Sequence, residues 1–120
     1  MDLGKFSLSL KVTDLEESLE FYTKLGFIVI DGGHQNSGFP DSEKMKWRIL
    51  ENSSVKIGIF QGMFPHNILT FSLSNLLEKQ KRLKEAGIKF EREAPEDSSS
   101  GPLSAMLTDP DGNQIMFDQV

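Results

Sequence analysis

The sequence contains two copies of one unit, each about sixty residues long. Residues 8–27 align without gaps with residues 69–88, at an offset of 61, and residues 57–60 align with residues 115–118 at an offset of 58. The polar residues between the apolar ones recur as well, so chance similarity of short apolar stretches is the weaker explanation. A repeat requires both halves to form the same supersecondary unit, and the chain is therefore predicted to consist of two similar modules.

Each module is predicted to begin with a strand and a helix. Residues 6–12 alternate apolar and polar side chains, which is the period of a strand with one buried face. Thr13 and Glu16 have the spacing of a capping box, in which each side chain binds a free backbone amide. Gly26 stands where a helix commonly ends in a left-handed residue. The second module carries the corresponding residues, with Ser74 or Asn75 at the cap and Gly87 at the end.

Three strand-like segments follow each predicted helix, so each module has the order β-α-β-β-β and the fold class is α+β. In the first module these segments are residues 27–30, 45–51 and 55–60. In the second module they are residues 88–92, 103–108 and 114–117. A single domain is expected over residues 1–120, with one module at residues 5–61 and the other at residues 66–119.

Turn residues separate the last two predicted strands of each module, at residues 52–54 and 109–113. The second turn reads Asp-Pro-Asp-Gly-Asn, which shares features with a calcium-binding loop. The acidic residue that such a loop needs at its twelfth position is absent, so a tight hairpin turn is predicted instead.

Composition excludes several classes of function. The chain has no cysteine, which removes disulfides, thiolate metal sites and cysteine nucleophiles, and its only histidines are His34 and His66. The net charge of −5 disfavours nucleic acid as a partner, because phosphate binding needs clustered lysine and arginine. The sequence shows neither an apolar run of membrane-spanning length nor a signal-peptide profile, so we expect a cytoplasmic protein that binds no membrane.

Two motifs resemble a known family. Residues 21–27, Phe-Tyr-Thr-Lys-Leu-Gly-Phe, and the turn at residues 109–113 look like the glyoxalase, bleomycin-resistance and extradiol-dioxygenase group, called the vicinal oxygen chelate superfamily. The resemblance covers nearly the whole chain. It implies that each module curls its sheet into a half barrel around a ligand cavity, and that the chain forms a homodimer whose paired modules come from the same chain or from different chains. It does not select a reaction, since the group includes isomerases, dioxygenases, epimerases, thiol transferases and binding proteins.

Strand alternation predicts which residues face the ligand. The apolar residues of the first strand must meet the helix, so Ser7, Ser9 and Lys11 are expected on the concave face. Alternation on the next strands places Lys46, Arg48 and Leu50 on the same face, whereas Trp47 points the other way and is expected in the core. The predicted ligand-binding residues are Ser7, Ser9, Arg48, Lys56, Phe60, Thr70, Met106 and Met116.

The basic residues of this set suggest an anionic ligand. Lys11, Lys46, Arg48 and Lys56 would together make a basic cavity in an acidic protein, which would attract a carboxylate or phosphate. The alternative is that lysines near strand ends curl into solvent. Arg48 is the strongest candidate, because its guanidinium can hold a carboxylate with two hydrogen bonds. Phe39, Phe60 and Phe64 would equally suit an aromatic ligand.

Metal-dependent relatives of the resembled family place ligands on the first and last strands of each module. The corresponding residues of this sequence are Ser7, Gly58, Ile68 and Met116. None is a usual ligand for the hard divalent ions of this chemistry, so neither a metal nor another cofactor is predicted. His66 and Asp118 are the best remaining pair of donors.

Two loops invite a functional interpretation. His34 and Gln35 lie in a long connection after the second predicted strand, and they are candidate lid residues over the cavity. The alternative is an exposed loop histidine without a task. The three serines at residues 98–100 lack the lysine and the spacing of a phosphate-binding motif, so a flexible connection is expected there.

These observations predict a small-molecule-binding protein of the glyoxalase and bleomycin-resistance type without the usual metal ligands, whose ligand is anionic or aromatic. The alternative is a glyoxalase-like lyase or isomerase, or a dioxygenase, that binds a metal through other residues. A purely structural or protein-interaction module is a third hypothesis.

Overall fold

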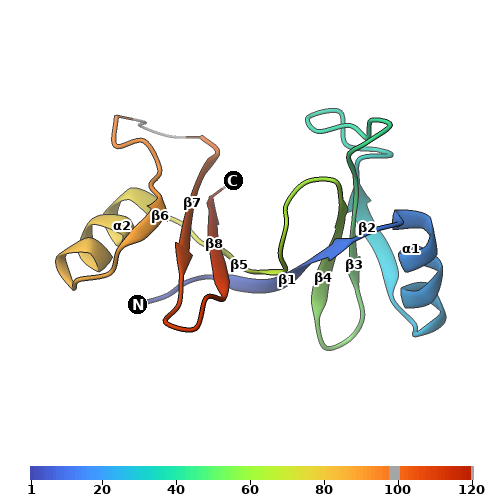
Figure 1. Ribbon diagram of the computed structural model, residues 1–120, viewed down its shortest axis with the longest axis horizontal. Helices are drawn as coiled ribbons and strands as arrows, with labels where there is room; N and C mark the ends of the chain where they lie inside the picture. Colours follow the sequence, from blue (N-terminus) through green and yellow to red (C-terminus); the bar gives the residue numbers. More distant parts are fainter. Residues whose placement is uncertain (98–100, 120) are drawn as a thin grey trace. The chain divides into compact units, whose positions relative to one another are not determined.

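The computed structural model describes residues 1–97 and 101–119, and that part of the chain forms two helices and eight strands (Figure 1). The predicted α+β class and the β-α-β-β-β order of each module are confirmed. The first module consists of β1 (Lys5–Val12), α1 (Leu15–Lys24), β2 (Ile28–Gly32), β3 (Lys46–Glu51) and β4 (Lys56–Gln61). The second consists of β5 (Ile68–Ser72), α2 (Leu76–Glu85), β6 (Phe90–Arg92), β7 (Leu103–Thr108) and β8 (Gln114–Gln119).

The described residues fall into two compact units. The N-terminal unit comprises residues 7–67, and the C-terminal unit combines residues 1–6 with the described residues from position 68 onward. The first two residues of β1 therefore belong to the C-terminal unit, and the rest of β1 belongs to the N-terminal unit.

In the N-terminal unit the strands lie in the order β2-β3-β4-β1. β3 is antiparallel to both of its neighbours, and β1 is parallel to β4. Helix α1 covers one face of this sheet, where Leu15, Leu50 and Ile59 are at most 1% exposed (Figure 1). We call the opposite face, which carries Ser9 and Gly58, the open face of this unit.

In the C-terminal unit the strands lie in the order β5-β8-β7-β6, with β5 parallel to β8 and the other pairs antiparallel. Helix α2 shares its core with one face of this sheet, and Leu76 and Ala105 are 0% exposed there. The first residues of the chain contribute to the same unit. Leu3 packs against its core, and the ring of Phe6 lies 5.4 Å from the ring of Phe71 between centroids.

Helix α1 begins one residue later than the predicted capping box requires. Asp14 is the cap, with an extended backbone (φ −132°) and a side-chain oxygen that accepts a hydrogen bond from the Glu17 amide at 3.1 Å. The predicted box between Thr13 and Glu16 is therefore wrong. Aspartate caps a helix at least as well as threonine, and with Asp14 as the cap the helix starts at the buried Leu15.

The other helix ends are partly as predicted. Gly26 and Gly87 follow α1 and α2 with φ of +100° and +94°, which confirms the left-handed residue expected at each position. Asn75 occupies the cap position of α2 but is itself left-handed, with φ of 53°, and its side chain makes no capping bond. The predicted side-chain cap of α2 is therefore wrong.

A glutamine from the last strand of each module completes the helix start instead. Gln61 Oε1 accepts a hydrogen bond from the Leu15 amide at 2.8 Å, and Gln119 Oε1 accepts one from the Leu76 amide at 2.8 Å. Both amides belong to the first residue of their helix, where no intrahelical partner exists. The repeat seen in the sequence therefore extends to an equivalent contact in each unit.

The remaining differences are local. β2 continues to Gly32, two residues beyond its predicted end, and a bulge interrupts its pairing with β3 between Val29 and Asp31. The predicted serine loop at residues 98–100 lies outside the described residues. Neither helix of the described chain has the length and apolar character that a bilayer crossing requires.

Candidate ligand-binding site

Strand register decides which side chains share the open face of the N-terminal unit. Ser9 lies opposite Gly58, and Lys11 lies opposite Phe60, in the β1–β4 pair. Trp47 is the partner of Phe60 in the β3–β4 pair. Partners in register project from the same face of a sheet, so these five residues share the open face. The predicted orientation of Ser9, Lys11, Gly58 and Phe60 is confirmed, and their contact with a ligand stays a prediction.

The predicted orientation of β3 is wrong. Arg48 lies opposite Ile59, which places it on the face that α1 covers, and Leu50 is 0% exposed in the core on that face. Lys46 is on the same face, with Nζ 3.9 Å from a carboxylate oxygen of Glu16 in α1. Alternation alone did not fix the phase of this strand, because apolar residues occupy both sets of positions.

Trp47 is buried, as predicted, but on the open face rather than beneath the helix. Its ring is parallel to that of Phe60, with 6.2 Å between centroids and 4° between planes. Phe39 stands edge-on to Trp47 at 6.3 Å, and Phe64 lies 5.1 Å from Phe60. We call Phe39, Trp47, Phe60 and Phe64 the aromatic cluster. Stacked and edge-on pairs of this kind make a preferred surface for a further aromatic ring.

The ring of Phe60 occupies the space above Gly58, the position on this strand where the resemblance implies a metal ligand. A Cβ atom at position 58 would lie 2.4 Å from Phe60 Cε2 and 3.2 Å from the side chain of Ile49. Glycine is therefore required for the cluster to close over the sheet. A coordinating side chain at this position would displace Phe60.

The other three positions where the resemblance implies a ligand do not fit a divalent ion either. Ile68 has no donor atom, Met116 offers a soft thioether, and Ser7 a neutral hydroxyl, whereas hard divalent ions take carboxylate and imidazole ligands. Across residues 1–97 and 101–119, no three His, Asp or Glu side chains are grouped so that they could hold a metal ion. His66 and Asp118, the remaining donor pair named from the sequence, belong to different units.

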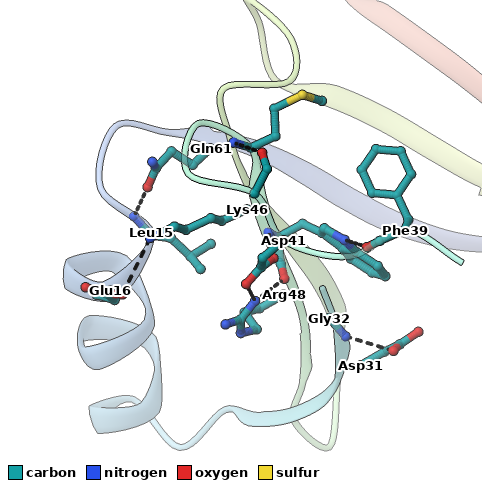
Figure 2. A network of polar contacts seen from close by, with 12 residues as sticks. Leu15, Glu16, Asp31, Gly32, Phe39, Asp41, Lys46, Arg48 and Gln61 are labelled. Carbon is teal, nitrogen blue, oxygen red and sulfur yellow. Dashed lines mark hydrogen bonds and ion pairs between the residues drawn. The ribbon is translucent and has the colours of Figure 1, made fainter. Parts of the chain in front are cut away.

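A network of polar contacts ties the loop between β2 and β3 to the strands beside it (Figure 2). Arg48 Nη1 donates to Asp41 Oδ2 at 2.8 Å and to the Trp47 carbonyl at 2.7 Å. Asp41 Oδ1 accepts a longer bond, 3.3 Å, from the Trp47 amide. The guanidinium predicted to hold a ligand carboxylate therefore holds a carboxylate of its own chain.

Two opposing effects act on Asp41. Burial opposes ionisation of its carboxyl, but the hydrogen bond from Arg48, the Trp47 amide and the nearby positive charge outweigh burial and hold the pKa of Asp41 below its usual value. Asp41 is therefore ionised at neutral pH. Sequence reasoning missed this residue, because nothing in the order of residues 33–45 marks one acid as the partner of Arg48.

The candidate lid residues belong to the same loop. His34 is exposed, and its charge makes a small contribution to lowering the pKa of Asp41. Gln35 is also exposed, and its side-chain amide makes a long bond of 3.5 Å to the Ile30 carbonyl. The structure places both outside the aromatic cluster, and a lid role for them stays a prediction.

The candidate residues of the C-terminal unit come together as the alternation predicts. Thr70 lies opposite Met116, which in turn lies opposite Met106, so the three share the face opposite α2. Asp118 is on the same face, and burial raises the pKa of its carboxyl. In the N-terminal unit Lys56 is exposed and lies opposite Glu51 in register.

Two solvent-open hollows lie beside α1 rather than at the aromatic cluster. One of about 420 Å³ is lined by residues of α1 and of the turn before it, and one of about 560 Å³ lies between the end of α1 and the β3–β4 hairpin. The first hollow holds one edge-on pair, Phe21 and Tyr22, with 5.2 Å between ring centroids. Neither hollow holds a stacked pair like Trp47 and Phe60, so the larger group of rings favours the open face.

Comparison with protein families gives one match over most of the chain. The model of the glyoxalase/bleomycin resistance protein/dioxygenase superfamily matches residues 6–117. None of the curated proteins is similar enough to match.

Several solved structures share the fold. A superfamily member from Vibrio splendidus is 16% identical, with a TM-score of 0.67 over 97% of this chain and 98% of that one. Methylmalonyl-CoA epimerase from Mycobacterium tuberculosis is 17% identical, with a TM-score of 0.67 over 94% and 85%. A protein of Legionella pneumophila named as an NAD-dependent benzaldehyde dehydrogenase is 13% identical, with a TM-score of 0.71 over 97% and 99%. At these identities the likeness establishes the fold alone.

Proposed function

Since the chain belongs to the glyoxalase/bleomycin resistance protein/dioxygenase superfamily, we propose that it binds a flat aromatic small molecule on the open face of its N-terminal unit, without a metal ion. The aromatic cluster is the observation that carries this proposal. Four aromatic rings on a sheet face that the helix leaves uncovered provide stacking surface, and Phe39 keeps 45% of its own surface exposed.

The charges around the cluster favour an anionic substituent on that ligand. Lys11 is exposed and lies opposite Phe60, so its ammonium can reach a carboxylate or sulfonate whose ring stacks on Phe60. Arg48 does not supply this charge, because it is on the other face and paired with Asp41. The ligand class is therefore an aromatic acid rather than a phosphate held by several basic residues.

A fluorescent aromatic sulfonate tests the site directly. Titration with 8-anilinonaphthalene-1-sulfonate should give saturable binding, and Phe60→Leu should weaken it about fivefold, because one stacked ring contributes on the order of 1 kcal/mol. Ile88→Ala is the control, since Ile88 is 42% exposed, belongs to the C-terminal unit and is outside the cluster. Equal loss in both variants would mean that the probe binds exposed apolar surface in general.

Metal analysis tests the other half of the proposal. Protein purified without chelator should contain no stoichiometric divalent ion, and nickel, zinc or manganese should leave its melting temperature unchanged. One tightly held ion per chain with a raised melting temperature would contradict the proposal. It would favour the alternative of a lyase, isomerase or dioxygenase with non-standard ligands.

We also propose the homodimer that the family resemblance implies. Phe21, Leu25 and Ile28 are about 60% exposed at the end of α1 and the start of β2, and β2 is an edge strand of its unit. Exposed apolar side chains beside an unpaired strand edge are a common site of self-association. Sedimentation velocity should give twice the chain mass for the wild type and a monomer for Phe21→Ser with Ile28→Ser.

A further inference from the structure

We propose that Asp41 and Arg48 are positioning residues of the aromatic site. They clamp the loop of residues 33–45 so that Phe39 and Trp47 hold one geometry before a ligand arrives. The inference rests on the proposed function, because a fixed geometry of these rings matters to binding only if the aromatic cluster holds the ligand. Fixing a site in advance strengthens binding, since the ordering cost is already met in the free protein.

The clamp begins where the loop leaves β2. The Gly33 amide donates to the Trp47 carbonyl at 3.0 Å, and the Asp41 amide donates back to the Gly33 carbonyl at 3.0 Å. These two bonds bring the start of the loop, its later part and β3 to one place. The loop of residues 33–45 is therefore closed on itself rather than free, and we call it the strap.

The Asp41 carboxylate joins the strap to β3. One oxygen accepts from the Trp47 amide and the other from Arg48, and the same Arg48 nitrogen donates to the Trp47 carbonyl. The Asp41 and Arg48 side chains are only 22% and 14% exposed, so solvent screens the pair weakly. Both backbone polar groups of Trp47 are thereby held by the clamp.

The absence of a side chain at Gly33 leaves the space that the Asp41 carboxylate occupies. A Cβ atom on Gly33 would lie 2.0 Å from Asp41 Oδ1 and 2.7 Å from the Asp41 amide nitrogen. Any other residue at position 33 would push Asp41 out. The glycine is thus required by close approach, because its backbone does not have a positive φ.

The strap also holds the Trp47 side chain. Two residues before Asp41, the Phe39 carbonyl accepts a hydrogen bond from the indole Nε1 at 2.8 Å, and the Phe39 ring stands edge-on to the indole. Figure 2 shows Phe39 and Asp41 on the same strap, with Arg48 directed at Asp41. Release of Asp41 would therefore free Phe39 and the indole together. Phe39 is the half-exposed edge of the cluster, so its position limits the size of ring that fits.

Trp47 is the single tryptophan of the chain, so indole fluorescence and indole hydrogen exchange report on this residue alone. Asp41→Asn and Arg48→Gln should shift its fluorescence to longer wavelength, speed hydrogen exchange of the indole N–H about tenfold, and weaken binding of 8-anilinonaphthalene-1-sulfonate about fivefold. The double variant should be no weaker than either single one, because the two residues act as a unit. Arg48→Lys, which keeps the charge but not the planar fork, should fall between.

Glu43→Gln is the matched control, because Glu43 is an exposed acid of the same loop that makes no ion pair within the described residues. It should change none of the three readouts. If Asp41→Asn does not fold, indole exchange in the unaltered protein decides the question. Exchange at the rate of free tryptophan would show that the strap is open, and would overturn the proposal.

The two proposals fail in different ways. If Phe60→Leu weakens the probe while Asp41→Asn leaves exchange and affinity unchanged, the clamp is not a positioning device and the aromatic site stands. If Asp41→Asn frees the indole but neither wild type nor Phe60→Leu binds the probe, the proposed function is overturned, and with it the assignment of the clamp to a binding site.

Discussion

Gln61 completes the first turn of α1 from a distance of 46 positions in the sequence, through a bond of 2.8 Å between its side-chain oxygen and the amide of Leu15. The last strand of the module is thereby fixed to the start of the helix that covers it. Gln119 and Leu76 repeat the contact in the second module. The relationship links the end of the last strand to the helix more specifically than apolar packing does, because one amide must face one oxygen.

We expect Gln61→Ala to lower the free energy of unfolding by about 1 kcal/mol, because a partly buried amide at the helix start loses its partner. Gln61→Glu should cost less, since a carboxylate still accepts the bond and carries a favourable charge at a helix N-terminus. Urea denaturation measures both. Gln35→Ala is the control, as Gln35 is exposed. An unchanged midpoint for Gln61→Ala would show that water replaces the glutamine without loss.

We expect Gly58→Ala to disturb the aromatic cluster. The added methyl group would lie 2.4 Å from the Phe60 ring, so the ring must move, at a cost of about 1–3 kcal/mol. Loss of the near-ultraviolet circular dichroism of Trp47 should accompany the change in stability. Gly38→Ala is a suitable control, because the nearest atom to its added methyl group is 3.2 Å away, at the end of the Asn36 side chain. A native spectrum in Gly58→Ala would mean that Phe60 does not cover this position.

We expect Gln80→Leu to be among the most damaging changes in α2. Gln80 is 2% exposed, and its side-chain amide both donates to the Ala94 carbonyl at 3.1 Å and accepts from the Ala94 amide at 2.8 Å. Leucine would leave both backbone groups buried without partners, at a cost of about 2–4 kcal/mol. Lys81→Ala, at an exposed position of the same helix, should change the midpoint of thermal unfolding little. Similar midpoints for the two variants would refute this assignment.

We expect Asp118→Asn to stabilise the protein at neutral pH by less than about 1 kcal/mol. Burial raises the pKa of the Asp118 carboxyl above its ordinary 3.8, so the charged form is less favourable in the folded chain than in the unfolded one. The wild type therefore loses stability as pH rises from 3.8 through the raised pKa, and Asn removes that loss. The urea midpoint of Asp118→Asn should therefore exceed that of the wild type, by a difference that grows as pH rises across this range. A constant difference between the two midpoints at every pH would contradict this prediction.

The repeat made the fold predictable. Each module had to repeat the order of the other, so the turn at residues 109–113 supported a similar turn at residues 52–54, and the two glycines supported each other as helix ends. The same repeat also indicated which side chains of β3 face the helix. β3 and β7 have six residues each at the same place in their modules, so Arg48 corresponds to Ala105, which is 0% exposed beneath α2. Polarity alone placed Arg48 on the wrong face.

The clamp was beyond sequence reasoning for a different reason. Asp41 meets Arg48 only because Gly33 lets the loop fold back onto β3, and the course of a long loop is not encoded in a periodic pattern. The aromatic cluster was partly accessible, since Phe39, Phe60 and Phe64 could be named as suited to an aromatic ligand. Trp47 was missed because its strand was placed in the wrong phase.

The division of β1 between the two units has a consequence for biosynthesis. Residues 7–67 hold every residue of the core of the N-terminal unit, so that core can form as soon as they leave the ribosome. Leu3 and Phe6 must wait, because the core and the ring they pack against come from residues translated after that unit is finished. Substitutions of Leu3 or Phe6 should therefore slow maturation of the C-terminal unit.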